Sequence, residues 1–552
     1  LGVEAEALSP AELIRGVLRA PVDLLYNGGV GTYVKAATET QADAVDKAND
    51  PVRVDARELR CRVVGEGGNL GFTQRGRIEY AQSGGPEHLG GRINTDAIDN
   101  VAGVNTSDHE VNIKILLDGL LRRQEIQEPE RNQLLVEMTD AVAANVLYDS
   151  YVQGQAISLS LIQAKPMIDV HGRLIRWLEL QAGLDRELEA LPSEDEISER
   201  KSTDRGLTSP EIAVVIAYCK IHLYAELLES DLPEDDYLGH DLEHYFPHAL
   251  ERFRPRMGSH RLRREIIASV VANELVDRAG TTFAFRLGEE TGAPTPLLAR
   301  GYTVAREVFR LLSFWHQVEA LDGQIGAAVQ LDMLIEGRRL AERAARALVR
   351  GNPTRIDIES SVRRFEPGVR LLDDQLEDLL EGADLDAFRG RAGELQDSGV
   401  PAELARRVAA MPSQPAAFDV VTVAADGRHE LAAATRAYFR IGARLELNWL
   451  RDRIVELPRA NRWQALARTA LREELLGAQR ELTREILEAT VGAADTDQAI
   501  DRWSATHAAG VERLQQTLAE IRASGIYDTT TLAVGLREVR ALIRGQTGFT
   551  RA

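Results

Sequence analysis

The sequence predicts an α/β fold, in which a partial parallel sheet is followed by a large, mainly α-helical region. Up to about residue 125, three short apolar runs each lead into a polar loop and then into helical sequence. This alternation of strand, loop and helix is typical of parallel βαβ units. Beyond that point, nearly every segment carries apolar residues at helical spacing.

The first part is expected to hold three strands and several helices. The expected strands lie at 22–26, 61–64 and 92–98. The expected helices lie at 10–19, in part of 33–49, at 72–82 and at 108–124. The first helix has a clear start, because Ser9 suits the cap, Pro10 the first helical position and Glu12 the return bond to the cap.

Polar loops follow all three expected strands. Parallel strands place their carboxyl ends at one edge of a sheet, and ligands bind in the loops at that edge. We therefore expect the loops after residues 26, 64 and 98 to form one candidate site.

The remainder of the chain is expected to be helical. The predicted helices lie at 132–156, 157–185, 211–229, 261–278, 297–319, 324–349, 374–380 and, as several long helices, within 429–544. Polar stretches containing Pro or Gly predict breaks near 192–206 and 412–428. We therefore divide the chain into a sheet-containing domain at 1–125 and a helical region at 126–552.

Composition excludes several classes of protein. A hydrophobic fraction of 44% and a charged fraction of 28% are those of a globular protein. The formal net charge of −20 argues against broad binding to nucleic acid or to anionic membranes, because phosphate contacts need clustered Lys and Arg.

The two cysteines and the apolar runs point to an intracellular setting. Cys61 and Cys219 lie far apart in sequence, which rules out a disulfide framework and a cysteine-based zinc site. We expect a reducing, cytoplasmic location, no membrane span and no signal peptide. The chain starts at Leu1 and enters ordered-looking sequence at once, so we expect it to be a fragment of a longer protein.

Two glycine-rich loops have competing interpretations. The loop at 27–32 could bring backbone amides close to a phosphate, but Val34 occupies the third glycine position of G-x-G-x-x-G, so a generic turn explains it as well. The loop at 65–69 could likewise approach a ligand, and Asn69 offers both a donor and an acceptor. An Asn in such a loop is equally a common turn residue.

The third loop contains carboxylates and a hydroxyl. Asp96 and Asp99 could hold a metal, but no further ligands stand at chelating spacing, so turn chemistry is the simpler interpretation and no metal is expected. Ser107 and Glu110 form a capping-box pattern, although a hydroxyl at a helix N-terminus also suits a substrate carboxylate.

Three histidines in the helical region, His240, His244 and His248, have the spacing of one helical face. They do not form an H-E-x-x-H metal motif, so we interpret them as partly exposed structural residues.

Three segments resemble the nucleotide-binding domain of glutamate dehydrogenases, most closely that of the large bacterial NAD-specific enzymes. These segments lie at 23–35, 64–73 and 94–114. Shorter matches in the helical part lie at 207–213, 244–247, 262–267 and 289–293. The loop E-G-G-N at 66–69 is similar to the family's E-G-A-N, with Gly in place of Ala. The run N-V-A-G-V at 100–104, followed by Ser107, is similar to N-A-G-G-V-x-x-S.

The resemblance implies roles for five residues. Asn69 and Asn100 would contact the nicotinamide end of NAD, and Gly28 and Gly29 would lie beside its ribose. Ser107 would hold the distal carboxylate of glutamate. The family's catalytic lysine and aspartate belong to an earlier part of its sequence, so the resemblance implies a C-terminal piece that starts within a Rossmann-like domain.

The implied function is NAD-dependent oxidative deamination of L-glutamate to 2-oxoglutarate and ammonia. This piece is expected to be inactive alone, and the whole enzyme is expected to be a homo-oligomer. The alternative is a non-catalytic helical interaction or regulatory module that carries a vestigial α/β piece. The two hypotheses differ in whether Asn69, Asn100 and Ser107 converge beside the carboxyl edge of a parallel sheet.

Overall fold

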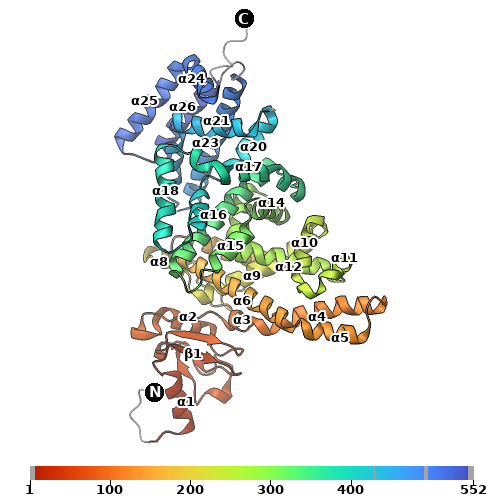
Figure 1. The fold of residues 1–552 in the computed structure, drawn as a ribbon. Helices are drawn as coiled ribbons and strands as arrows, with labels where there is room; N and C mark the ends of the chain where they lie inside the picture. Colours follow the sequence, from red (N-terminus) through yellow and green to blue (C-terminus); the bar gives the residue numbers. More distant parts are fainter. Residues whose placement is uncertain (1–6, 428, 460, 490–494, 545–552) are drawn as a thin grey trace. The chain divides into compact units, whose positions relative to one another are not determined.

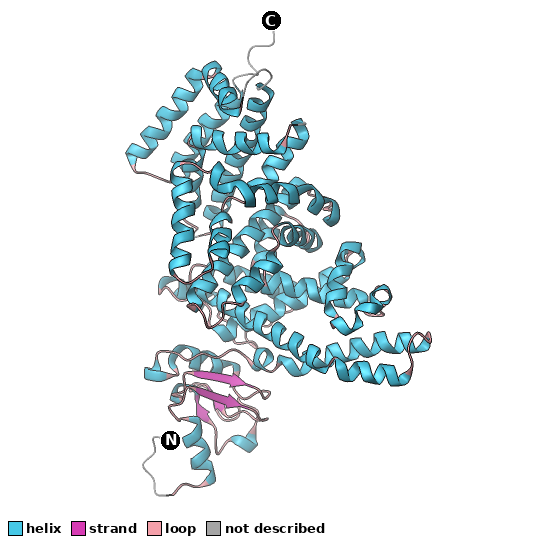
Figure 2. Cartoon of the chain, viewed as in Figure 1, coloured by secondary structure: helices cyan, strands magenta, loops and turns pink. Residues whose placement is uncertain are grey.

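The computed structural model describes residues 7–427, 429–459, 461–489 and 495–544 (Figure 1). Helices make up most of the described chain, and the strands lie together in its N-terminal part (Figure 2). The chain forms two compact units. The first comprises Leu1–Glu289 with Pro294–Ala299, and the second comprises Glu290–Ala293 with Arg300–Ala552.

Two pairs of parallel strands form the sheet structure of the first unit. Strand β1 (Leu24–Asn27) pairs with β4 (Val63–Glu66), in a register that aligns Leu24 with Val63. Strand β2 (Val34–Lys35) pairs with β3 (Val54–Asp55). The structure confirms the strands predicted at 22–26 and 61–64, whereas β2 and β3 were not predicted.

The strand predicted at 92–98 is wrong over most of its length. Only Arg92 forms a parallel bridge, on the side of Val63 away from β1, and Asp96–Asp99 forms the short helix α3. The reason is that the carboxylates after Ile93 bond to the end of β4 and to the loop that follows it, so this run does not continue the sheet. Asp99, for example, accepts a hydrogen bond from the backbone N of Glu66 at 3.0 Å.

The helix predicted within 33–49 is also wrong, apart from a single 3₁₀ turn at Lys47–Asn49. This segment folds around the buried guanidinium of Arg53. That group donates to the carbonyl of Thr32 at 2.8 Å and to the carboxylate of Asp50 at 2.6 Å, and it also bonds to the carbonyl of Asp46. These tertiary bonds outweigh the helix propensity of the alanine-rich sequence.

Two helices cover this part of the chain as predicted. Helix α1 (Pro10–Leu18) begins with a complete capping box between Ser9 and Glu12. Helix α2 (Gln74–Ser83) is capped by Thr73, and its Tyr80 lies fully buried in the core beneath β4. The other residues of this core are Val34, Val54, Ala56, Leu59, Cys61, Val64, Phe72 and Ile93.

A buried ion network fixes the end of β4. Glu66 is the last residue of the strand and is 0% exposed. The guanidinium of Arg77, on α2, pairs with both of its oxygens at 2.7 and 2.9 Å, and also pairs with Asp96 at 3.0 Å. Burial raises the pKa of Glu66, and the adjacent Arg77 opposes that rise. The bidentate geometry ties strand, helix and the start of α3 together.

Helices dominate the remainder of the first unit, where α9 packs against α12 and α4 against α6. The helices are α4 (Val101–Arg122), α5 (Glu128–Glu137), α6 (Thr139–Ile162), α7 (Ile168–Gln181), α8 (Glu194–Ser202), α9 (Ser209–Leu228), α10 (Gly239–Tyr245), α11 (Arg254–Met257), α12 (Arg263–Asp277) and α13 (Phe283–Thr291). Short 3₁₀ turns lie at Ala56–Glu58, Pro86–His88, Leu232–Glu234, Asp236–Leu238 and His248–Phe253.

Pro247 separates the three histidines predicted to share one helical face. Helix α10 holds His240 and His244, whereas His248 lies in the 3₁₀ turn beyond the proline. The prediction of a common helical face is therefore wrong. His240 and His248 are largely exposed, as expected.

The second unit is helical throughout its described residues. After α14 (Thr295–Val308), its helices are α15 (Leu311–Glu319), α16 (Ala327–Gly351), α17 (Ile358–Leu379), α18 (Gly382–Asp397), α19 (Ala402–Ala410), α20 (Ala416–Gly427), α21 (Leu431–Arg444), α22 (Leu447–Glu456), α23 (Arg462–Ala489), α24 (Thr496–Thr506), α25 (Ala508–Ser524) and α26 (Thr529–Arg544). The single helix predicted at 297–319 is interrupted, because Arg310 adopts a left-handed conformation with φ 52°.

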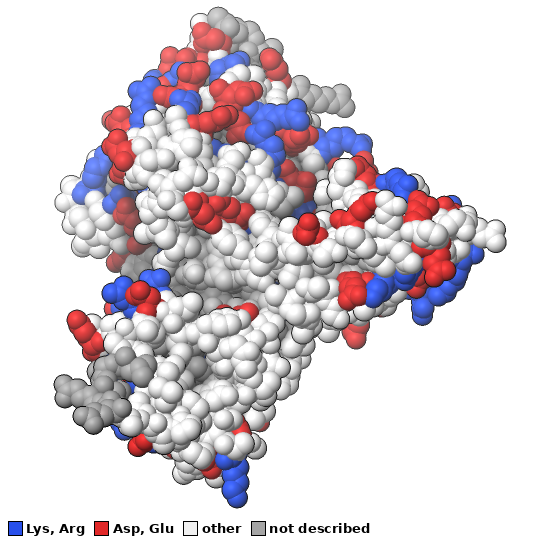
Figure 3. All heavy atoms as spheres, turned by 60° about the horizontal axis from the view of Figure 1, so that its bottom comes forward, with Lys and Arg blue, Asp and Glu red and all other residues white. Residues whose placement is uncertain are grey.

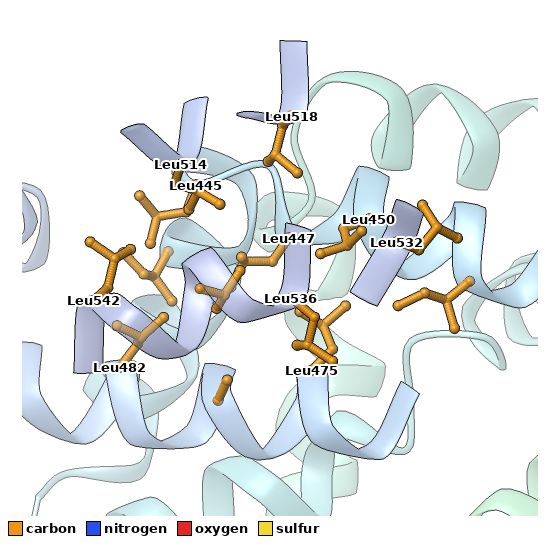
Figure 4. Packing of buried hydrophobic residues seen from close by; sticks show 14 of the residues in the cluster. Leu445, Leu447, Leu450, Leu475, Leu482, Leu514, Leu518, Leu532, Leu536 and Leu542 are labelled. Atoms are coloured by element: carbon orange, nitrogen blue, oxygen red, sulfur yellow. The ribbon is translucent and has the colours of Figure 1, made fainter. Parts of the chain in front are cut away.

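Leucines form the core of the C-terminal helices. Leu450 from α22, Leu475 from α23 and Leu536 from α26 point toward one another in Figure 4. Each of these residues is nearly inaccessible to solvent, which is what the helical spacing of apolar residues predicted. The stretches predicted to be breaks, 192–206 and 412–428, contain the helices α8 and α20.

No helix in the described part of the chain combines the length and the apolar composition that a membrane span requires. On the face of the molecule in Figure 3, Lys and Arg side chains are interspersed with Asp and Glu instead of gathering in one basic area.

The buried network predicts a large cost for removing one partner. We expect Glu66→Gln to lower the free energy of unfolding by about 3 kcal/mol, because Arg77 stays buried with half of its charge compensation removed. The matched control is Glu199→Gln, which breaks the exposed pair with Arg205 and should cost less than about 1 kcal/mol. Equilibrium urea denaturation measures both, and equal losses would contradict the role given to the network.

The free energy of unfolding should depend on pH through the buried His171. His171 on α7 is buried, its Nδ1 has no hydrogen-bond partner among the described residues, and burial with nearby Arg286 lowers its pKa to about 4. The unfolded chain binds the proton at the ordinary pKa of about 6.5. Stability from this residue is therefore complete above pH 6.5 and is lost as the pH falls toward 4, by up to about 3 kcal/mol.

The His171→Leu variant should remove this part of the pH dependence of unfolding between pH 7 and 4. An unaltered slope in His171→Leu would show that another group is responsible.

Candidate functional site

The candidate site lies at the carboxyl ends of β1 and β4. Gly28 and Gly29 follow β1, and Asn69 follows β4 at the same edge, because the strands are parallel. The two loops touch through their backbones. Gly68 N donates to Asn27 O at 2.9 Å, and a Cβ placed on Gly68 would lie 2.2 Å from the carbonyl oxygen of Gly29. The structure thus brings the first two predicted loops together.

Tyr26 accounts for two of the glycines in the second loop. Its ring lies over β4, so that a Cβ on Gly65 would lie 3.3 Å from the ring and one on Gly67 would lie 2.0 Å from its hydroxyl. These glycines are therefore needed for packing within the chain. By contrast, a Cβ on Gly29 would meet nothing within 4 Å, so this residue leaves open space at the sheet edge.

Asn69 and Asn100 lie in direct contact. Nδ2 of Asn100 donates to Oδ1 of Asn69 at 2.7 Å, and both side chains are exposed at this bond. Neither amide has another side-chain hydrogen bond within the described residues. Each amide offers one donor group and one acceptor. Whichever way the two amides are oriented, their mutual bond leaves one NH₂ group and one carbonyl oxygen available.

The aspartates Asp96 and Asp99 hold this arrangement in place. Asp96 accepts from the backbone N of Leu70 at 2.8 Å, and Asp99 accepts from Glu66 N and from the side chain of Asn94. Turn and loop bonding therefore explains both carboxylates, as the sequence indicated. Within the part of the chain that the structure describes, no three His, Cys, Asp or Glu side chains are grouped so that they could hold a metal ion.

Ser107 does not cap a helix, and that interpretation is wrong. Helix α4 begins at Val101 and is flanked by Asn100, so Ser107 lies within it and its side chain is exposed. The sequence misled because Gly103 and Asn105 are weak helix formers, whereas the helix continues through them. Ser107 has no side-chain hydrogen bond in the described structure.

Ser107 nevertheless lies on the same face of α4 as Asn100. The two are seven residues apart, which is close to two turns, or about 10 Å along the axis. Val104 and Val111 share this face and are 67% and 50% exposed. Asn69, Asn100 and Ser107 are thus presented along one exposed, partly apolar strip that begins at the sheet edge.

Sequence reasoning missed the residues that support the site. The network of Glu66, Arg77 and Asp96 was not predicted. A signal was present, because Glu66 stands two residues after the buried Val64 and so points to the same face of β4. An acidic residue on a buried strand face requires a cationic partner.

A separate groove of about 1120 Å³ lies in the first unit, between α2 and the segment from Glu179 to Arg200. Ion pairs between Arg186 and Glu179 and between Arg200 and Glu211 neutralise much of its lining. None of the predicted site residues lines this groove.

Comparison with known proteins links both parts of the chain to one family. Residues 204–541 match the family model described as "Glutamate dehydrogenase, C-terminal", and residues 1–160 match "Bacterial NAD-glutamate dehydrogenase, catalytic domain". The chain is 43% identical over 541 residues to the NAD-specific glutamate dehydrogenase of Pseudomonas aeruginosa. It is 42% identical over 542 residues to that of Mycobacterium tuberculosis and 41% identical over 539 residues to that of Halomonas elongata. Each match covers 98% of this chain but only 33% of the relative.

The loop contact at Gly68 can be tested with a matched pair of glycine substitutions. We expect Gly68→Ala to lower the free energy of unfolding by about 1–3 kcal/mol, because its methyl group would displace the backbone at Gly29. Gly103→Ala meets nothing within 4 Å inside α4 and should raise it by about 0.5–1 kcal/mol. Urea denaturation gives both values, and a neutral Gly68→Ala would mean that the two loops are further apart.

Proposed function

Because this chain belongs to the glutamate dehydrogenase family, we propose that it is part of an NAD-dependent enzyme that converts L-glutamate to 2-oxoglutarate and ammonia. The chain spans about a third of the length of the curated relatives it matches. The observation that carries the proposal is the contact between Asn69 and Asn100 at the carboxyl edge of two parallel strands. Nucleotides bind at this edge in parallel α/β sheets.

The paired amides suit the nicotinamide end of NAD. A carboxamide carries one acceptor and one NH₂ group, and the pair formed by Asn69 and Asn100 leaves the complementary donor and acceptor. The open space at Gly29 and the backbone amides of Gly28 and Gly29 would adjoin the ribose. When bound, NAD accepts the hydride from the α-carbon of glutamate, and this chain's contribution is to hold and orient the ring that receives it.

Ser107 would bind the distal carboxylate of glutamate. Its exposed hydroxyl has no partner within the described residues, so it is available as a donor. The neighbouring Val104 and Val111 offer apolar contact for the aliphatic part of a substrate. Ser107 lies about two helical turns from Asn100, so the substrate carboxylate would bind about 10 Å from the residues that contact the cofactor.

We infer that the exposed face of the strand pair packs against a further layer in the whole enzyme. Leu24, Tyr26 and Val63 lie on one face of β1 and β4 and are exposed, although such residues usually pack inside proteins. We assign this pair to a Rossmann-like domain at 1–125, whose remaining strands and catalytic lysine and aspartate belong to the rest of the enzyme. On this basis the chain alone is inactive.

We further propose that the enzyme is cytoplasmic. The two cysteines, Cys61 and Cys219, are buried and unpaired, which suits a reducing cytoplasm. We also propose that the whole enzyme is a homo-oligomer.

The assignment of Ser107 can be tested in the full-length enzyme. We expect Ser107→Ala to raise KM for glutamate by about 10- to 100-fold, the effect of losing a hydrogen bond to a charged group of about 1.5–3 kcal/mol. KM for NAD should change little, because Ser107 lies about two helical turns from Asn100.

The control for this experiment is Thr106→Ala. Thr106 is also exposed on α4, but its hydroxyl donates to the carbonyl of Ala102 and points to another side of the helix. In steady-state kinetics, kcat and both KM values of this variant should equal those of the parent enzyme. If Ser107→Ala also kept parental kinetics, Ser107 would have no substrate role, and the alternative of a non-catalytic helical module would gain.

A further inference from the structure

A cluster of arginines lies between α16 and α23 in the second unit. Helix α16 contributes Arg343, Arg346 and Arg350, which follow one another at helical spacing, and α23 contributes Arg468 and Arg472, four residues apart. The two helices meet here, because Arg350 forms an ion pair with Glu473 of α23. We call these five residues the arginine cluster.

Carboxylates neutralise only part of the arginine cluster. Arg346 pairs with Glu290 at 2.7 Å and with Glu342 at 2.6 Å, and Arg350 pairs with Glu473. Arg343 and Arg472 have no ion pair or hydrogen bond among the described residues, and Nε of Arg472 is buried without an acceptor. Among the described residues, three carboxylates therefore form ion pairs with this group of five guanidiniums, which leaves a surplus of two positive charges. Glu336 also lies near Arg343, but it pairs with Arg339.

Burial makes this surplus costly. Neither Arg343 nor Arg472 is fully exposed. Burial, together with the charges of Arg346 and Arg343, lowers the pKa of Arg472 to about 9, and burial lowers that of Arg468 to about 10. Both groups are still charged at neutral pH. Burial and the neighbouring positive charges make the charged state of these guanidiniums unfavourable. A bound anion would compensate that free-energy cost.

We propose that the arginine cluster binds a small, multiply charged oxyanion between α16 and α23. A guanidinium presents a planar fork of N–H donors that matches phosphate and carboxylate oxygens in pairs. Arg343 and Arg472 present two such forks without partners in the described structure, and Arg468 lies beside them, so the cluster corresponds to an anion of at least two negative charges. Because both are partly buried, the cluster suits a small ion better than an acidic protein segment. Phosphate-bearing and polycarboxylate ligands share this chemistry.

Thermal unfolding of the chain in the presence of pyrophosphate or citrate tests the proposal. Sodium chloride at matched ionic strength is the reference. We expect at least one of the two anions to raise Tm by about 5 °C at roughly 100 times its Kd. A response to pyrophosphate alone identifies a phosphate site, a response to citrate alone identifies a carboxylate site, and both support the cluster. A response no larger than that to chloride overturns the proposal.

The double variant Arg343→Gln/Arg472→Gln locates the effect. Without anion, its Tm should equal or exceed that of the parent, because two uncompensated charges are removed, and the response to the anion should disappear. Arg363→Gln is the matched control, since Arg363 is an exposed arginine on α17 that pairs with Glu359, and it should keep the full response. An anion response that persists in the double variant overturns the assignment.

A labelling experiment on the parent chain does not depend on any variant folding. Phenylglyoxal modifies guanidinium groups, and peptide mass spectrometry measures the rate of modification at Arg343, Arg472 and the exposed Arg363 at pH 8. The effective anion should protect Arg343 and Arg472 by at least about fivefold while leaving Arg363 unaffected. Equal protection at Arg363 would show a general salt effect and would overturn the proposal.

Discussion

The pairing of Arg77 with Glu66 and Asp96 is the interaction on which the candidate site depends. Glu66 ends β4, Asp96 begins α3, and Arg77 belongs to α2, so one guanidinium joins three elements. Asp96 also accepts from the backbone of Leu70, next to Asn69. The position of Asn69 relative to Asn100 therefore follows from charges that lie out of solvent, where an unpaired member is far more costly than at the surface.

The sequence predicted the elements whose signals are local. The strands that became β1 and β4 are apolar runs followed by glycine-rich loops, and α1 carries its own capping box. The errors fall in segments whose backbone conformation is determined by hydrogen bonds to residues outside the segment's own helix or strand pattern. The segment after residue 33 is organised by Arg53, whose partners come from turns along it. The run after Ile93 leaves the sheet because Asp99 bonds to the last residue of β4 and Asp96 bonds to the loop that follows β4.

The candidate site shows the same division at the level of single residues. The glycine-rich loop that follows β4 indicated a candidate ligand site. In the structure, however, contacts within the chain explain why Gly65, Gly67 and Gly68 lack side chains, because they face the ring of Tyr26 and the carbonyl of Gly29. Glycine content alone therefore does not indicate a ligand. The contact between Asn69 and Asn100 is more informative, because it joins residues 31 positions apart and leaves hydrogen-bonding groups unused. No periodicity in the sequence reveals such a pairing.

The buried and partly buried arginines of this molecule are of two kinds, those paired with carboxylates of the chain and those proposed to bind an anion. Arg77 is buried, and carboxylates occupy its fork, so its surroundings are complete within the chain. Arg343 and Arg472 are partly buried and have no ion pair or hydrogen bond among the described residues, in a chain whose net charge is −20. An overall negative charge works against long polyanions, because their many phosphates need an extended basic surface. It does not prevent a local positive surplus, since the Debye length of about 8 Å at physiological salt confines each charge to its neighbourhood. Whether a buried arginine has its carboxylate within the chain is thus the criterion that separates a structural tie from an anion site.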